Sequence, residues 1–102
     1  MTIYTSEKVM PYVYMGIHRE TNEFYIGSRT AISLSEPSHI DLFQYKTSSK
    51  YVKPRFSEFD WYIVAEFFDA DDAYAYEQQL IYDHLHTPGL LNRVCYHGKQ
   101  TF

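Results

Sequence analysis

Two short runs rich in tyrosine and β-branched residues constrain the fold more than any other feature of the sequence. They read YVYMGI at residues 12–17 and EFYIGS at residues 23–28, and a polar, turn-prone stretch separates them. In a strand, successive side chains point to opposite faces, so short alternating runs of this kind are typical of strands. Two such runs around a polar loop predict an antiparallel hairpin over residues 12–28.

The register of this hairpin decides which side chains meet. If the loop centres between Arg19 and Glu20, Tyr14 lies directly opposite Tyr25, with both side chains on one face and Cβ atoms about 5 Å apart. A slip of one residue would move the two rings to opposite faces. We therefore predict a tyrosine pair on one face of the hairpin, pointing toward Arg29 at the end of the second run.

The length of the chain bounds the rest of the fold. With 102 residues we expect a single domain over 1–102, without room for a second core. No apolar run is long enough to cross a bilayer, and the N-terminal residues lack the zones of a signal peptide, so no membrane partner is expected. The lone Cys95 cannot form an intramolecular disulfide, which favours a packing role for it and a cytoplasmic location.

The middle of the chain gives weaker signals. We interpret residues 30–44 as a loop with a short helical turn. Ser48 or Ser49 can cap a short helix that Pro54 would close. The run FDWYIVAEFF at residues 59–68 is a strong strand with little polar alternation, so we expect it to be central and covered on both faces.

A helix follows at residues 69–86, with Asp69 as its N-cap and Pro88-Gly89 beyond its end. Glu77 lies inside the apolar stripe of this helix, four residues after Ala73 and three before Leu80. Burying an unpaired carboxylate is costly. The first interpretation is a boundary glutamate paired with a lysine or a tyrosine hydroxyl. The second is a carboxylate ligand for Mg²⁺, which accepts one or two protein oxygens together with phosphate oxygens and waters.

Charge is unevenly distributed along the chain. The net charge of −4 argues against a dedicated nucleic-acid binder. Eight of the thirteen acidic residues fall between positions 58 and 83, yet four of the nine basic residues lie within ten positions. Such a basic cluster can attract a phosphate backbone, although a solvated charged surface explains it as well. The four residues are Lys46, Lys50, Lys53 and Arg55.

Taken together, two facing tyrosines, an arginine, a basic segment and an inward glutamate are the parts needed to hydrolyse a phosphodiester. A tyrosine can orient or deprotonate water, an arginine can stabilise developing phosphorane charge, and a metal can stabilise the leaving oxygen.

In these features the chain resembles the GIY-YIG nucleases, and especially their phage-associated, homing-endonuclease-like branch. The motifs that carry the resemblance are YVYMG around Tyr14, YIGSR from Tyr25 to Arg29, YKTSSK at residues 45–50, AYEQQL around Glu77, and Asn92. The resemblance extends over about residues 11–93.

The resemblance implies a small α/β (α+β) fold, a three-stranded antiparallel sheet flanked by helices. It implies a metal-dependent DNA endonuclease that holds one Mg²⁺ or Mn²⁺ ion on Glu77. Tyr14 would be the general base or the residue that orients water, with Tyr25 as its partner and Asn92 as a support at the rim. Gly27, lacking a side chain, would let the phosphate approach the strand. A phage-encoded chain would act in the host cytoplasm.

Two departures from the family pattern matter. The sequence has Tyr12-Val13-Tyr14 where the family has Gly-Ile-Tyr, and the best-known members carry their catalytic arginine on a helix further downstream. We expect Arg29 to contact the phosphate, with Arg55 as the alternative; Tyr45 fits the assisting position better than His39. The residues expected to bind DNA are Gly27, Ser28, Tyr45, Lys46, Ser49, Lys50, Lys53, Arg55 and Asn92.

A rival function is a catalytically inactive module of the same fold that binds nucleic acid or a protein partner. Family members commonly attach a separate DNA-recognition domain, and the 102 residues have no room for one beside the catalytic domain. Sequence specificity would therefore come from a further segment, a partner protein or a homodimer, or the protein would have none. A zinc site at His84, His86 and His97 is disfavoured, because these residues lack both a thiolate cluster and helical i,i+4 spacing.

Overall fold

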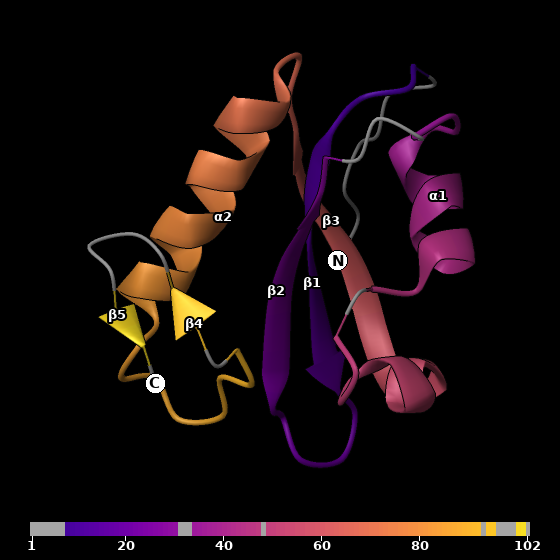
Figure 1. Ribbon diagram of the computed structural model, residues 1–102. Helices are drawn as coiled ribbons and strands as arrows, with labels where there is room; N and C mark the ends of the chain where they lie inside the picture. Colours follow the sequence, from indigo (N-terminus) through magenta and orange to yellow (C-terminus); the bar gives the residue numbers. More distant parts are fainter. Residues whose placement is uncertain (1–7, 31–33, 48, 93, 96–99, 102) are drawn as a thin grey trace.

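A three-stranded antiparallel sheet forms the centre of the fold, in the order β2-β1-β3 (Figure 1). The computed structural model describes residues 8–30, 34–47, 49–92, 94–95 and 100–101. The elements in chain order are β1 (Tyr12–His18), β2 (Phe24–Arg29), α1 (Ser38–Tyr45), the 3₁₀-helix η1 (Lys53–Glu58), β3 (Phe59–Glu66), α2 (Ala70–Asp83), β4 (Val94–Cys95) and β5 (Gln100–Thr101). The predicted α+β class and its three-stranded antiparallel sheet are confirmed. No helix in these ranges is long and apolar enough to cross a membrane.

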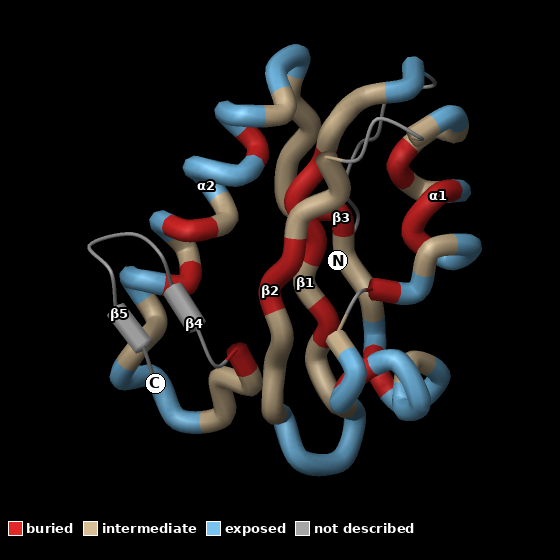
Figure 2. The backbone as a smooth tube through the Cα atoms, viewed as in Figure 1, coloured by how far each residue is buried: buried red, intermediate tan, exposed pale blue. Residues whose placement is uncertain are grey.

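Helices cover both faces of the sheet: α2 lies on one side, and α1 lies on the other (Figure 1). We call these sides the α2 face and the α1 face. Alternation along each strand gives each face its own core, and buried residues line both (Figure 2). The buried cluster on the α2 face is Val13, Ile26, Ala73 and Ile81. The buried cluster on the α1 face is Tyr12, Tyr14, Leu42 and Ile63.

The central strand is β1, not the run at residues 59–68. That run forms β3, which is an edge strand among the described residues and pairs there with β1. Its lack of polar alternation predicts a central strand, and that prediction is wrong. Because helices cover both faces of this small sheet, an edge strand is apolar on both faces too, so the pattern does not separate the two positions.

The register of the hairpin differs from the prediction by two residues. Tyr14 pairs with Gly27, and Tyr25 pairs with Gly16, so the two tyrosines are not directly opposite. The loop centres one residue later than expected, with Asn22 at φ 64° just before β2. A shift of two preserves the face, and the Tyr14 and Tyr25 rings share the α1 face with centroids 6.2 Å apart.

The glycine at position 27 explains this register. A Cβ atom there would lie 2.5 Å from the Tyr14 hydroxyl oxygen, closer than real contacts allow. Gly27 therefore makes room for the Tyr14 ring across the strand pair, whether or not a phosphate also approaches the strand. Tyr12 pairs with Arg29, which puts the arginine on the same α1 face as the tyrosines.

The segment between β2 and β3 is more helical than predicted. Residues 30–44, expected to be a loop with a short turn, contain most of α1, which begins after Pro37. The prediction of a helix that ends before Pro54 is wrong. The Ser49 hydroxyl does accept the Val52 N–H at 3.2 Å, but the helical residues are those of η1, with Pro54 in the first turn. Proline fits there because it has no N–H to leave unpaired. Ser48 lies outside the described residues.

The helix α2 follows the prediction closely. Asp69 caps it, with its carboxylate accepting the Asp71 N–H at 2.8 Å. Ala73 and Ile81 are buried against the sheet, so Glu77, one turn from each, lies on the sheet-facing side of the helix. The helix ends at Asp83, before the predicted residue 86, and Gly89 adopts a positive φ of 95° in the turn that follows.

Candidate active site

The outer edge of β2 is closed by three different groups rather than by a fourth full strand. Phe24 exchanges backbone hydrogen bonds with Gly89 and Leu91, both 2.8 Å. Asn92 then presents its side chain to Ile26, accepting the N–H at 3.0 Å and donating to the carbonyl at 2.7 Å. Its amide thus imitates a strand, which gives Asn92 a supporting place at this edge.

Glu77 closes the next position along the same edge. Its carboxylate accepts the Ser28 hydroxyl at 3.1 Å and the Gln78 amide at 3.2 Å. Burial raises the pKa of the Glu77 carboxyl, and hydrogen bonds from Gln78 and from the side chain and backbone of Ser28 offset only part of that. Among the described residues no cation pairs with Glu77. Among the described residues neutral donors replace the expected lysine or tyrosine partner, so none of these residues compensates the charge of the carboxylate.

The surroundings of Glu77 limit what kind of ion it could hold. In the part of the chain that the structure describes, no group of three or more His, Cys, Asp or Glu side chains could hold a metal. A zinc cage is thus absent from those residues; His97 lies outside them. The oxygen donors at the edge, Glu77 and the Ser28 hydroxyl, fit a hard cation such as Mg²⁺, which keeps several waters and needs few protein ligands.

Tyr14 is the most enclosed of the predicted site residues, at 1% exposed. Its hydroxyl donates to the Thr47 hydroxyl at 2.8 Å. Burial raises the pKa of Tyr14, interactions with Tyr25, Tyr45 and Glu77 raise it further, and the hydrogen bond to Thr47 offsets part of that rise. Glu77 has the smallest of these effects, and it acts from the opposite side of the sheet.

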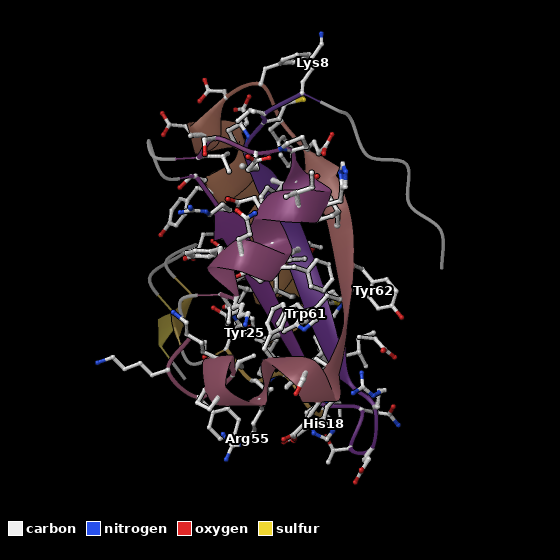
Figure 3. All side chains as sticks on the ribbon, turned by 90° about the vertical axis from the view of Figure 1, so that its right-hand side faces the viewer. Lys8, His18, Tyr25, Arg55, Trp61 and Tyr62 are labelled. Carbon is white, nitrogen blue, oxygen red and sulfur yellow. The ribbon has the colours of Figure 1, made fainter. Side chains whose placement is uncertain are left out.

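Tyr25 keeps part of its ring accessible. It lies on the α1 face between α1 and η1, beside Trp61 (Figure 3). Of the two tyrosines, Tyr25 is therefore the one that a substrate on this face can reach.

Thr47 is a site residue that the sequence did not reveal. It is fully buried and has a positive φ of 67°, which is strained for a β-branched residue. Besides the Tyr14 hydroxyl, its oxygen accepts the Ser49 N–H at 3.3 Å. The strained turn after α1 thus holds the Tyr14 hydroxyl in place. Thr47 belongs to the YKTSSK motif, but no spacing rule singles it out.

Arg29 is held by two residues of α1. Its Nε donates to the buried Asp41 carboxylate at 3.0 Å, and its guanidinium lies 4.1 Å from the centroid of the Tyr45 ring. Asp41 also accepts the Tyr12 hydroxyl at 2.6 Å. Burial, followed by the hydrogen bond to Asp41, raises the pKa of Tyr12. The two Nη groups of Arg29 have no hydrogen-bond partner among the described residues, so they are available to an anion.

Asp41 does not stand out in the sequence, because the pattern of residues 30–44 predicts a loop. Once α1 is known to be a helix, Asp41 and Tyr45 are four residues apart and share one side of it, where both reach Arg29.

The basic residues of the 46–55 segment are all exposed. None of the four forms an ion pair with a residue that the structure describes. Arg55 lies over the Tyr51 ring, 4.5 Å from its centroid, rather than over Tyr14 or Tyr25. The structure thus brings Arg29, and not Arg55, to the face of the two tyrosines.

Comparison with known proteins gives no matching family model, no matching curated protein and no matching solved structure.

Proposed function

We propose that the protein is a metal-dependent DNA endonuclease, or the catalytic domain of one, with a site of the GIY-YIG type. The observation that carries this proposal is the Glu77 carboxylate, half-buried at the β2 edge without a cationic partner among the described residues. A divalent cation would supply the missing charge, and when bound beside a phosphate it would stabilise the leaving oxygen. Glu77 would hold it, with the Ser28 hydroxyl beside it.

The two tyrosines take different roles. Tyr14 stays protonated at neutral pH, because burial raises its pKa by more than the hydrogen bond to Thr47 lowers it. A group in this state does not deprotonate water. We therefore assign to Tyr14 the positioning of its neighbour, and to the more accessible Tyr25 the contact with the attacking water and the phosphate.

Arg29 binds the scissile phosphate through its two Nη groups, which have no hydrogen-bond partner among the described residues. Asp41 and Tyr45 hold the guanidinium from two sides, so little side-chain entropy is lost when the phosphate arrives. A fixed guanidinium stabilises charge that develops on the phosphate oxygens without having to reorganise. Lys46, Lys50 and Lys53 contact the flanking DNA backbone.

The burial of Tyr14 also favours a second candidate, a module of the same fold that binds nucleic acid or a protein partner without cutting it. In that case Tyr14, Thr47 and Asp41 form a polar core under the α1 face and have no part in chemistry. Cutting activity separates the two functions.

Plasmid nicking tests the proposal. We expect the protein to convert supercoiled plasmid to the nicked form with Mg²⁺ or Mn²⁺ and to lose this activity in EDTA. Tyr25→Phe should lower the rate by about a hundredfold. Tyr62→Phe is the matched control, because Tyr62 lies in β3 at the other edge of the sheet, away from Tyr25 (Figure 3). Absence of cutting by folded protein with every divalent metal would favour the non-catalytic module.

A further inference from the structure

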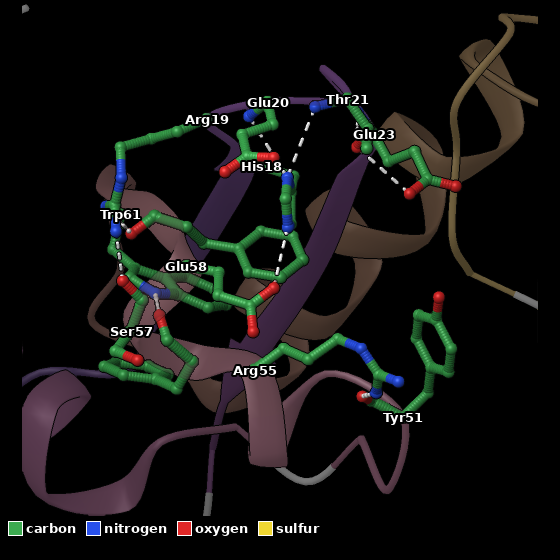
Figure 4. A network of polar contacts seen from close by, with 12 residues as sticks. His18, Arg19, Glu20, Thr21, Glu23, Tyr51, Arg55, Ser57, Glu58 and Trp61 are labelled. Atoms are coloured by element: carbon green, nitrogen blue, oxygen red, sulfur yellow. Dashed lines mark hydrogen bonds and ion pairs between the residues drawn. The ribbon is translucent and has the colours of Figure 1, made fainter.

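Tyr51 and Arg55 form a preassembled stacking pair on the surface. Tyr51 is 50% exposed, and the Arg55 guanidinium lies 4.5 Å from the centroid of its ring. Arg55 Nη1 also donates to the Tyr51 carbonyl at 2.9 Å, and Figure 4 shows the two side chains side by side. This bond keeps the guanidinium at the ring, so the pair presents an aromatic ring and a planar cation together.

The surface around this pair is positively charged. No acidic residue occurs between Asp41 and Glu58, while the segment carries three lysines besides Arg55. The acids that follow this segment are already engaged. Glu58 forms a hydrogen bond with His18 at 2.9 Å (Figure 4), and Asp60 pairs with Arg19 at 3.2 Å. The lysines and Arg55 therefore keep their charge for an external anion.

Aromatic contacts connect this surface with the tyrosine face of the candidate active site. The exposed Phe43 ring packs against Phe56 in a T-shaped arrangement with centroids 5.7 Å apart, and Phe56 stacks on Trp61 with centroids 4.6 Å apart. Trp61 in turn lies 5.8 Å from Tyr14. The segment before Tyr51 is tied to the same place, because the Thr47 hydroxyl binds Tyr14. A nucleic-acid strand bound along this segment would thus run toward Tyr25.

The combination of rings and cations distinguishes between forms of DNA. In a duplex the faces of the bases are covered by the neighbouring bases, so an exposed tyrosine has no base to stack on. Lysines alone would be enough to bind the phosphates of a duplex. An unpaired base can stack on the ring while its phosphates contact the lysines. We propose that the surface formed by Phe43, Lys46, Lys50, Tyr51, Lys53 and Arg55 binds single-stranded DNA. This deepens the proposed nuclease function, on which it rests, by making DNA with an unpaired stretch the substrate.

Binding measured without cutting tests the inference. The probes are a fluorescein-labelled oligothymidylate of about 15 nucleotides and a duplex of equal length, followed by anisotropy in EDTA. We expect the wild-type protein to bind the single strand more tightly. Tyr51→Leu should weaken single-strand binding about tenfold and leave duplex binding unchanged, whereas Tyr51→Phe should bind as the wild type does. The salt dependence of Tyr51→Leu should be unchanged, because no cation is removed.

Two controls keep the outcome interpretable. Phe68→Leu removes an aromatic ring that is 91% exposed and lies beside the acidic start of α2, so it should leave binding unchanged. Arg55→Lys keeps the charge but removes the planar group, so it should weaken single-strand binding severalfold. This variant still tests the inference if Tyr51→Leu does not fold.

The inference would be overturned if the wild-type protein bound the duplex as tightly as the single strand, or more tightly. It would also be overturned if Tyr51→Leu weakened binding of both probes equally, or changed binding of neither probe. A protein that binds single strands and never nicks overturns the nuclease function alone. A protein that nicks plasmid but shows no single-strand preference overturns this inference alone.

Discussion

The Glu77 carboxylate accepts the hydroxyl of Ser28 at 3.1 Å, and this contact joins α2 to the end of β2. The residues on either side of Ser28 act on the opposite face. Gly27 makes room for the Tyr14 ring, and Arg29 reaches Asp41. Three consecutive residues of one edge strand thus bring together a carboxylate from one face and a tyrosine and an arginine from the other.

Gly27→Ala should destabilise the protein by about 1–3 kcal/mol, because the new methyl group overlaps the Tyr14 ring. The ring cannot easily retreat, since Thr47 binds its hydroxyl and Trp61 packs against it. Urea unfolding measures the change. Tyr14→Phe in the same chain removes one of the overlapping atoms and frees the ring from Thr47, so the double variant should lose less than the sum of the two single losses. A single variant as stable as the wild type would contradict this packing.

The sequence predicted the hairpin, the α2 helix with its Asp69 cap, and the shared face of Tyr14 and Tyr25. These depend on local signals: alternation, a capping residue and a period of 3.6 residues. It did not predict the exact pairing of Tyr14 or the edge position of β3. The first depends on how the Tyr14 ring packs over Gly27, and the second on helices that cover both faces of the sheet.

Asp41→Ala should lower the free energy of unfolding by about 3–5 kcal/mol. It leaves Arg29 with an unpaired charge in a largely buried position, and it removes the acceptor of the Tyr12 hydroxyl. The side chains of this pair are only 15% and 7% exposed. Asp60→Ala is the control: its ion pair with Arg19 is 51% and 53% exposed and should be worth less than about 1 kcal/mol. Similar losses in the two variants, measured by urea unfolding, would show that Asp41 does not hold Arg29 as drawn.

Neutralising one of Lys46, Lys50 and Lys53 to Gln should weaken DNA binding for every sequence and lower the slope of log K against log salt by about one. Lys8→Gln should leave the slope unchanged, because Lys8 lies at the opposite end of the molecule from Arg55 (Figure 3). Anisotropy titrations over a range of salt concentrations measure the slope. If all three lysine variants keep the wild-type slope, this segment does not contact the DNA backbone.

The candidate site was predictable where one residue stands out in its own element, as Glu77 does in the stripe of α2. Asp41 and Thr47 could not be found in that way. Their importance comes from long-range contacts, with Arg29 across the α1 face and with the Tyr14 hydroxyl across 33 residues of chain. A buried hydroxyl pair or ion pair leaves no periodic signal in the sequence.

The stability of the metal-free protein should depend on pH through Glu77. Burial raises the pKa of this carboxyl above its ordinary 4.5, so between the two values the folded state binds more protons than the unfolded state. Stability is therefore highest below the ordinary pKa and falls as pH rises through the raised one. Glu77→Gln lacks this loss. Urea unfolding should show the stability of the variant gaining on that of the wild type as pH rises above the ordinary pKa of 4.5, and a difference that does not change with pH would contradict a raised pKa.

Nicking by Glu77→Gln, with DNA binding and melting temperature followed on the same samples with and without Mg²⁺, tests the central claim most directly. The amide keeps the shape of the side chain and removes the charge that would hold the cation. We predict that cutting falls by about a hundredfold or more, that DNA binding is kept or tightens, and that stability without metal is kept or rises. A variant that still cuts at the wild-type rate but melts at a lower temperature would contradict the account, because Glu77 would then be a structural residue.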